Sequence, residues 1–278
     1  MKINIYIATQ TEHDFPQDKN YIPLIVGKPD YKLDGSMNDS TGNNISGKNP
    51  FYCELTGQYW IWKNDHTSDV VGLCHYRRFL WINDIKRRLC RKNFNALNDT
   101  VNHHLDTSSL ESLLNEYDVV LPRPYIFSKD NIKSQFITYH GQKNYDLMTN
   151  SVKKLYPEYM NDLEQTFSRR YEYFANLIIA KKKLFDDYSE WLFTILNNVE
   201  NQIDLNDKNN ARLLGYMGER LLNVYVVHNH LNIKEVPQIF ISSQNDDEDL
   251  YIDFRYIKRR YFAGILDIEE RIRNKLKS

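Results

Sequence analysis

Residues 70–79 read Val-Val-Gly-Leu-Cys-His-Tyr-Arg-Arg-Phe. The apolar run has the length of one buried strand, and it stops abruptly at an imidazole, a phenol and two guanidinium groups. In α/β proteins, ligands bind outside the carboxyl ends of the sheet strands. Arg77 and Arg78 indicate an anionic ligand, because a guanidinium can pair with two phosphate oxygens at once. The alternative for this stretch is a strand followed by a salt-bridged turn.

The segments around this stretch predict an α/β fold with a parallel sheet. Residues 2–8 alternate polar and apolar side chains like a first strand, and residues 21–26 form a second short apolar segment. Residues 52–64 have helical apolar spacing, with Asn49 as the expected N-cap and Pro50 at the first helical position. A helix followed by a strand is typical of a parallel sheet.

The second half of the chain reads as mostly helical. Residues 116–124 form one more apolar strand, which also ends at a basic residue. Residues 131–200 have helical periodicity that Pro157 interrupts, and either Ser128 or Asp130 is expected to cap the first of these helices. Residues 213–227 read as a further helix.

Composition excludes several functional classes. The 278 residues carry a formal net charge of -1, which gives no global field to attract nucleic acid. The 3 cysteines are odd in number and lack metal-ligand spacing, so reduced thiols in a cytoplasmic protein are expected. No apolar run approaches the roughly 20 residues that cross a bilayer. Aromatic residues make up 13% of the chain, which is common where sugars stack on rings.

The common enzyme motifs are missing from the sequence. It contains no G-x-x-x-x-G-K-[ST], G-x-G-x-x-G, G-x-S-x-G or H-E-x-x-H. Their lack argues against P-loop NTPases, dinucleotide enzymes, α/β-hydrolases and zincins. The remaining loops, which are rich in Asn, Asp, Ser and Arg, suit a polyhydroxylated ligand that carries phosphate, such as a nucleotide sugar.

Several blocks also resemble a known family when they are taken in order: residues 39–46, 54–56, 59–64, 75–79, 121–124, 176–179, 185–193 and 218–222. The resemblance is to bacterial capsular, exopolysaccharide and O-antigen glycosyltransferases, long described as a domain of unknown function, and it covers about residues 1–230. Some members look like galactofuranosyltransferases. It implies a GT-A-like, Rossmann-type fold with added helices, a UDP-sugar donor, and a lipid-linked or oligosaccharide acceptor.

The sequence departs from the pattern of most GT-A enzymes at the residues that bind the metal ion. These enzymes end a central strand in Asp-x-Asp, whose carboxylates hold Mg²⁺ or Mn²⁺ against the donor diphosphate. The strand that begins at Val70 ends without a carboxylate. We therefore expect that cationic side chains replace the metal and that no cofactor is required. A Mg²⁺ or Mn²⁺ site at Asp34 and Asp39, in the long loop over residues 34–50, remains the alternative.

Glu219 is the first candidate for the catalytic base of an inverting transfer, because Asp or Glu commonly takes the acceptor proton. The small neighbour Gly218 is expected to leave space beside it. The alternative is a core salt bridge between Glu219 and Arg220. Glu54 is the second candidate, since a carboxylate in an apolar helix needs a partner if it is buried.

The remaining site predictions concern binding. The expected donor-binding residues lie at the end of the Val70 strand, in the long loop and in the following helix: His75, Tyr76, Arg77, Arg78, Asp39, Asn43, Asn44, Ser46 and Lys63. The expected acceptor-binding residues are Trp60, Trp62, His140 and Asn176. Two tryptophans two residues apart cannot share a helix face, so at least one belongs to the core. A structural role is the alternative for His140.

The sequence thus predicts a glycosyltransferase domain over residues 1–250 and a basic amphipathic tail over residues 251–278. Apolar residues recur at helical spacing in this tail beside Lys258, Arg259 and Arg260. This pattern indicates either peripheral contact with the inner face of the cell membrane or packing on the catalytic domain. A non-catalytic glycan- or nucleotide-binding module of the same fold is the alternative function.

Overall fold

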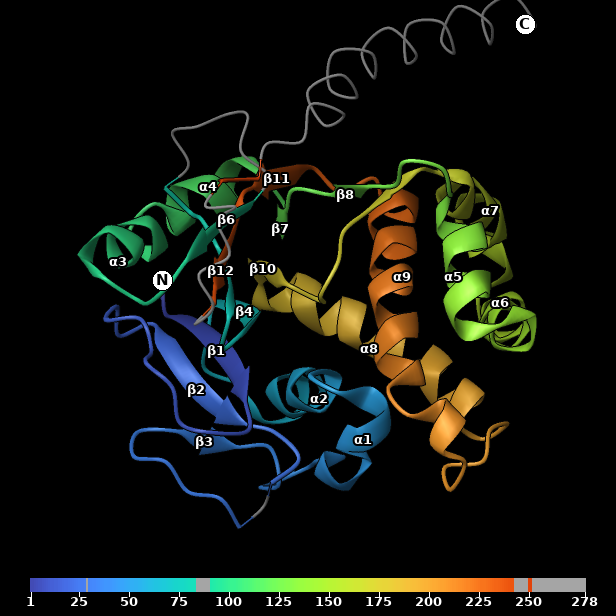
Figure 1. Cartoon of the computed structure of the whole chain (residues 1–278), viewed down its shortest axis with the longest axis horizontal. Coiled ribbons are helices and arrows are strands. Elements are labelled where there is room, and N and C mark those ends of the chain that lie inside the picture. Colours follow the sequence, from blue (N-terminus) through green and yellow to red (C-terminus); the bar gives the residue numbers. More distant parts are fainter. Residues whose placement is uncertain (29, 84–90, 243–249, 252–278) are drawn as a thin grey trace, which may run out of the picture.

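A central sheet runs through the protein (Figure 1). The computed structural model describes all residues except 29, 84–90, 243–249 and 252–278. The strands are β1 Ile3–Thr9, β2 Tyr21–Ile25, β3 Met37–Asn38, β4 Val70–His75, β5 Arg78–Leu80, β6 Arg91–Phe94, β7 Val119–Pro122, β8 Tyr125–Ile126, β9 Tyr171–Glu172, β10 Ile178–Lys181, β11 Ile233–Val236, β12 Gln238–Ile241 and β13 Leu250–Tyr251.

The main part of the sheet has the order β3-β2-β1-β4-β10-β7-β11. All neighbouring strands in it are parallel except β10, which runs antiparallel to both β4 and β7. The carboxyl ends of β1, β4 and β7 therefore meet at one edge of the sheet. A smaller set of strands, β5, β12, β6 and β13, continues from the end of β4.

Helices cover the two faces of this sheet: α1 Asn49–Tyr52, α2 Leu55–Asn64, α3 Asp99–Leu105, α4 Leu110–Glu116, α5 Ile132–His140, α6 Gln142–Leu155, α7 Met160–Ser168, α8 Lys182–Glu200 and α9 Leu213–His228. The larger core joins one face of the sheet to α2, α6, α8 and α9. The smaller core joins the other face to α3 and α4.

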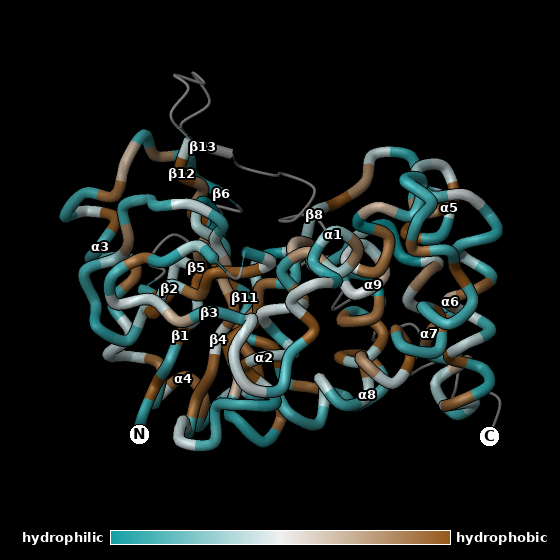
Figure 2. Tube along the Cα trace, turned by 90° about the horizontal axis from the view of Figure 1, so that it is seen from below, coloured by the Kyte–Doolittle hydropathy of each residue, from teal (hydrophilic) through white to brown (hydrophobic). Residues whose placement is uncertain are grey.

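Side-chain alternation in the strands explains why both faces can be covered. Tyr6 and Val71 belong to the larger core, whereas their neighbours Ile5 and Val70 belong to the smaller one. A strand that is buried on both faces reads as a continuous apolar run. Figure 2 shows the corresponding colours, with hydrophobic strands around β4 and mostly hydrophilic outer loops.

The prediction of one helix over residues 52–64 is wrong, because the segment is broken at Cys53. This residue has a φ of 53°, so the chain forms α1, the break and then α2. Asn49 is the first residue of α1 and not its N-cap, which is Lys48. The Asn49 side chain donates to the Cys53 carbonyl at 2.8 Å and to Thr56 Oγ1 at 3.0 Å. Thr56 N and Oγ1 also donate to this carbonyl, so the Asn49 side chain links α1 to the start of α2 across the break.

The helical prediction for residues 131–200 also needs correction. This region contains the strands β9 and β10 as well as four helices, and β10 lies in the middle of the sheet. The cap of α5 is neither Ser128 nor Asp130 but Asn131, whose side chain accepts from Ser134 N at 2.8 Å. The predicted helix over residues 213–227 is confirmed by α9. The predicted tail, apart from Tyr251, lies outside the described residues.

Candidate active site

The candidate site begins where β4 ends. The chain reverses in a tight turn after β4, and His75 pairs with Arg78 at the start of the antiparallel strand β5. This turn divides the basic motif. Arg78 lines a cavity, whereas Arg77 is exposed and lies over the rings of Tyr76 and Phe240.

The cavity at this edge of the sheet has a volume of about 500 Å³. Its walls come from the first residues of β5, β6 and β12, the end of β7, the chain before β10 and the first half of α9. Four arginines and one carboxylate lie among its lining residues, which are Arg78, Arg91, Pro122, Arg123, Pro124, Tyr125, Phe174, Ala175, Arg212, Tyr216, Glu219 and Gln238. We call this space the arginine cavity.

Two of these arginines are available to a ligand. Within the part of the chain that the structure describes, neither Arg78 nor Arg212 forms an ion pair with a carboxylate. The pKa of Arg78 is below its ordinary value because the side chain is partly buried. The nearby carboxylates of Glu54 and Glu219 offset this lowering only in part. A cationic cavity of this kind favours an anionic ligand that can pair with several guanidinium groups.

Glu219 is the carboxylate of the arginine cavity. Its Oε1 accepts from the backbone N–H of Ala175 at 3.1 Å, and its Oε2 accepts from Arg220 Nη1 at 2.6 Å. Burial, joined by the nearby charge of Glu54, raises the pKa of Glu219 to about 7 against the opposing charge of Arg220. The side chain stays 15% exposed. Glu219 therefore both forms the salt bridge with Arg220 and lines the arginine cavity.

Gly218 has a different role from the one expected. It leaves no open space beside Glu219, because a side-chain carbon at this position would lie 2.6 Å from Leu55 Cδ1. The glycine instead allows α9 to pack closely against the first residue of α2. This packing positions the turn of α9 that carries Glu219.

Arg220 lies behind Glu219 in a buried network. It is 2% exposed, donates to Gln135 Oε1 at 2.7 Å, and its Nη2 lies 3.4 Å from Glu172 Oε1. Glu172 is fully buried, and burial raises its pKa to about 8. One guanidinium thus faces two carboxyl groups, of which Glu172 holds its proton at neutral pH while the more exposed Glu219 is poised to ionise.

Glu54, the second base candidate, is not among the residues that line the arginine cavity. Its Oε1 accepts from Asn176 Nδ2 at 2.7 Å, and burial raises its pKa. His75 Nε2 lies 3.9 Å from the same oxygen. This contact is not an ion pair at neutral pH, because burial and then the charge of Arg78 lower the pKa of His75 to about 3. The nearby backbone of Ala175 opposes this lowering of the His75 pKa only in part.

The backbone beside these groups is strained. Ala175 and Asn176 have φ values of 71° and 50°, in the left-handed region that costs energy for residues with a side chain. The strained pair places the Ala175 N–H on Glu219 and the Asn176 amide on Glu54. Asn176, predicted to bind acceptor, therefore lies next to both candidate bases.

Of the other predicted acceptor-binding residues, His140 lies near the cavity and the tryptophans do not line it. The His140 ring stacks on Tyr216, a cavity-lining residue, with ring centroids 4.5 Å apart. Trp60 is 7% exposed, and its Nε1 donates to the Thr41 carbonyl at 3.0 Å. Trp62 stacks on Phe193 with centroids 5.8 Å apart.

The predicted donor-binding residues of the long loop are bonded within the loop region. Asp39 is fully buried, and its Oδ1 accepts from Ser46 Oγ and from Gly27 N. Asn43 Oδ1 accepts from the Tyr59 hydroxyl, and Asn44 Nδ2 donates to two loop carbonyls. These residues do not line the arginine cavity. Asp39 Oδ2 is buried without a partner among the described residues.

Two further donor-binding candidates have aromatic contacts. Tyr76 stacks on His13 with centroids 4.1 Å apart, which joins the loop after β1 to the turn after β4. Lys63 Nζ lies 3.2 Å from the centre of the Trp62 ring. Sequence reasoning did not select Arg91, Arg123 or Arg212, although the basic end of the strand before Arg123 was a usable signal.

Residues 4–230 match the model of a protein family described as a domain of unknown function, DUF4422. The chain belongs to this family. The family resemblance predicted from the sequence blocks is thereby confirmed.

One solved structure adds a functional relative. It is the apo structure of the WbbM bifunctional glycosyltransferase, which matches with a TM-score of 0.79 and 31% identity. The match covers 87% of this chain and 46% of that chain, so the DUF4422 chain spans less than half of WbbM. It shows that the mixed α/β fold with a largely parallel sheet is shared with a glycosyltransferase. A search of curated proteins gave no match.

Two searches of the described residues concern membranes and metals. None of the described helices is long and apolar enough to span a bilayer. No three His, Cys, Asp or Glu side chains among the described residues lie close enough together to hold a metal ion.

Proposed function

We propose that this DUF4422 protein is a glycosyltransferase that moves a sugar from a UDP-sugar donor to a growing surface polysaccharide. The observation that carries the proposal is the arginine cavity at the carboxyl edge of the sheet, where Arg78 and Arg212 lie beside Glu219 and form no ion pair with a carboxylate among the described residues. The similarity to a bifunctional glycosyltransferase supports the reaction class. Galactofuranose is the proposed donor sugar on the family resemblance alone.

The sheet topology supports a GT-A-like nucleotide-sugar site. Ligands of open α/β sheets bind outside the carboxyl ends of the strands, in the crevice where the strand order reverses. In the order β3-β2-β1-β4, this crevice lies between the ends of β1 and β4. His13 and Tyr76 stack across it, and Arg78 follows directly on the β4 side. This arrangement supports a nucleotide at the crevice with its phosphates toward the arginine cavity.

The proposed reaction uses Glu219 as general base. Its carboxylate takes the proton from the acceptor hydroxyl while that oxygen attacks the anomeric carbon of the donor. The bond between this carbon and the phosphate oxygen breaks, and UDP leaves with the electron pair. A base with a pKa of about 7 suits proton transfer at neutral pH. Although both oxygens accept hydrogen bonds, a carboxylate offers about four acceptor positions.

The arginines would stabilise the leaving UDP. Negative charge grows on the diphosphate as the bond breaks, and fixed cations in a partly buried site lower the energy of that state. Arg78 and Arg212 are proposed for this role in place of a divalent metal. His140 and Tyr216, stacked at the cavity, are proposed to contact the acceptor sugar.

The test is a donor screen with the purified chain, with and without EDTA, in which released UDP is measured. Without added acceptor, water takes the place of the acceptor hydroxyl, and we expect slow UDP release from one UDP-sugar. EDTA should leave this release unchanged, and Glu219→Gln should abolish it. Release that stops with EDTA and returns with Mn²⁺ would contradict the metal-free mechanism. Binding of UDP without any turnover would support a non-catalytic binding module.

A further inference from the structure

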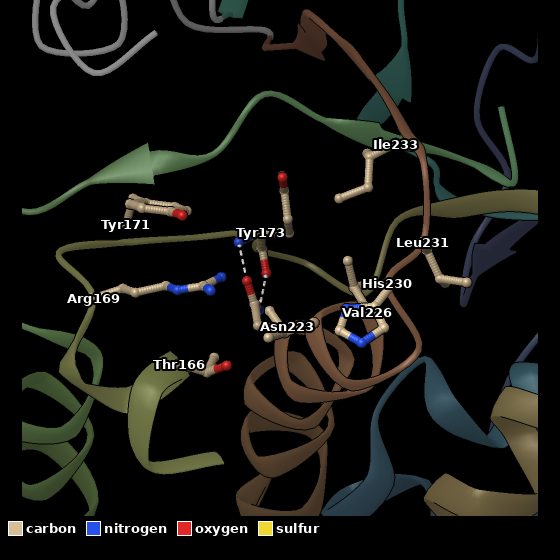
Figure 3. Close-up of a pocket in the computed structure, with 10 residues that line it drawn as sticks. Thr166, Arg169, Tyr171, Tyr173, Asn223, Val226, His230, Leu231 and Ile233 are labelled. Atoms are coloured by element: carbon tan, nitrogen blue, oxygen red, sulfur yellow. Dashed lines mark hydrogen bonds between the residues drawn. The ribbon is translucent and has the colours of Figure 1, made fainter. Parts of the chain in front are cut away.

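A second cleft lies on the opposite side of the chain segment that carries Glu172 and Phe174. It has a volume of about 370 Å³ and lies between the end of α7, β9 and the end of α9. Its lining residues are Thr166, Arg169, Tyr171, Tyr173, Asn223, Val226, Val227, His230, Leu231 and Ile233 (Figure 3). We call it the α7–α9 cleft.

The cleft and the arginine cavity share one extended segment and one helix face. Tyr171 and Tyr173 line the cleft, whereas Glu172 contacts Arg220 and Phe174 lines the cavity. This alternation is that of an extended chain with two faces. On α9, Glu219 faces the cavity and Val226 the cleft, seven residues or about 10 Å along the same helix face.

One wall of the cleft offers hydrogen-bond donors. Thr166 is 1% exposed, and its hydroxyl has no partner in the part of the chain that the structure describes. Arg169 lies over the Tyr171 ring at 5.7 Å and has no carboxylate partner among the described residues. Figure 3 shows the side chains of Thr166 and Arg169 pointing toward Asn223 on α9.

The facing wall is mostly aliphatic but includes the His230 ring, and Asn223 at the base of the cleft is already hydrogen-bonded. Val226, Leu231 and Ile233 lie across from the donors (Figure 3). Asn223 uses its whole amide, since it accepts from Tyr173 N at 2.8 Å and donates to the carbonyls of Tyr173 and Glu219. Thr166, Arg169 and the exposed His230 ring are therefore lining polar groups that a ligand can bond while it covers the aliphatic side chains.

We propose that the α7–α9 cleft binds one glycosyl unit of the growing glycan, separate from the sugars that react in the arginine cavity. A sugar ring has an apolar C–H face for the aliphatic wall and oxygens that accept from Thr166 and Arg169. A bare phosphate or carboxylate would satisfy the donors but leave the apolar wall uncovered. The volume lies in the ordinary range of small-ligand pockets.

This inference rests on the proposed function, because the glycan is the acceptor of that reaction. A distant sugar held in the cleft keeps the same glycan near the arginine cavity and raises its effective concentration there. The cleft would thus contribute to the binding of long acceptors and not to that of the donor.

The test is ligand-observed NMR with the full chain and the methyl glycosides of galactose, glucose and mannose as probes. We expect at least one glycoside to bind with a millimolar Kd. Thr166→Val keeps the shape and removes the hydroxyl, so binding should weaken about three- to tenfold, the loss typical of one hydrogen bond. Arg169→Ala, a change nearer the surface, should weaken it by a similar factor or more.

Ser168→Ala is the matched control, because this exposed hydroxyl donates to Gln165 O in its own helix. It should leave glycoside binding unchanged. A parallel UDP titration separates the two proposals, since Thr166→Val should keep UDP binding, whereas Arg78→Ala should weaken UDP binding and leave glycoside binding unchanged. If no glycoside binds, or if Thr166→Val and Arg169→Ala both bind like the unmodified protein, the cleft is not a sugar site.

Discussion

Two polar regions of the protein differ in how their side chains are satisfied. In the loop around Asp39, the amides and hydroxyls largely bond to one another and to loop carbonyls. In the arginine cavity, Arg78 and Arg212 lack carboxylate partners among the described residues, although Glu219 lies in the same cavity. The first pattern fixes a conformation. The second leaves charge available, which is the condition for binding an anionic ligand.

The largest expected effect concerns Glu219. Glu219→Gln keeps the shape and removes the basicity, so turnover should fall by roughly 10²–10⁴-fold while the affinity for UDP changes little. Steady-state kinetics with the donor found in the screen, together with UDP calorimetry, measures both quantities. Near-normal turnover would transfer the base role to Glu54.

The pH dependence sharpens the same assignment. Since the pKa of Glu219 is raised to about 7, its base form is lost as the pH falls through about 7. Turnover of the unmodified protein should therefore rise with pH across this value. A rate that is flat from pH 6 to pH 8 would argue against Glu219 as the base.

The next effect separates the two neighbouring arginines. Arg78→Ala should weaken UDP binding by about 10- to 100-fold, the loss expected for a charge-assisted hydrogen bond of ~1.5–3 kcal/mol. Arg77→Ala, at the exposed turn, is the matched control and should have a smaller effect. Calorimetry on the two folded variants measures the difference. Equal losses would mean that the turn after β4 contributes both side chains to the donor site.

Glu172 tests the network behind the cavity. Burial raises its pKa from 4.5 to about 8, so its contribution to stability is lost progressively from about pH 4.5, where the unfolded chain ionises, to about pH 8, where the folded protein ionises. Glu172→Gln cannot ionise and should keep its stability at high pH. We expect the Tm of Glu172→Gln to exceed that of the unmodified protein at both pH values, by a smaller margin at pH 6 than at pH 9.

The control for Glu172 is the exposed Glu190 on α8. Thermal unfolding of Glu190→Gln should follow the unmodified protein at both pH values. A Glu172→Gln variant that loses stability equally at pH 6 and pH 9 would show that the carboxyl is ionised in the folded protein.

The smallest effect is expected in the loop. Asn44→Ala removes two hydrogen bonds to loop carbonyls and one from Ser46 N, so the free energy of unfolding should fall by ~1–2 kcal/mol with little change in UDP affinity. Denaturant unfolding and UDP calorimetry check the two parts. A loss of UDP affinity at unchanged stability would instead support the donor-binding role predicted from the sequence.

The sequence predicted the parts of the fold that depend on local pattern. The apolar runs of β1 and β4 and the periodicity of α9 each span enough residues to be recognised. The short strand β10 was hidden in a helical region, because three apolar residues and a lysine fit either structure and only its partners β4 and β7 decide between them. The break at Cys53 depends on contacts with Asn49 and α9.

The sequence likewise predicted only part of the candidate site. Arg78, Glu219 and Glu54 could be selected because each lies next to an apolar run, where a buried charge is unfavourable unless a partner or a ligand pairs with it. Arg212 and Arg91 were missed, since they reach the cavity from segments more than a hundred residues apart in the chain. The positive φ at Arg212, which places it at the start of α9, has no signal in the local sequence.

The most direct test of the central claim is a crystal structure of the chain with UDP, grown in the presence of EDTA. The account predicts the diphosphate in the arginine cavity, with phosphate oxygens within hydrogen-bond distance of Arg78 and Arg212 and with no metal ion. A diphosphate that binds at the loop beside Asp39, or that binds only when Mn²⁺ replaces EDTA, would contradict it.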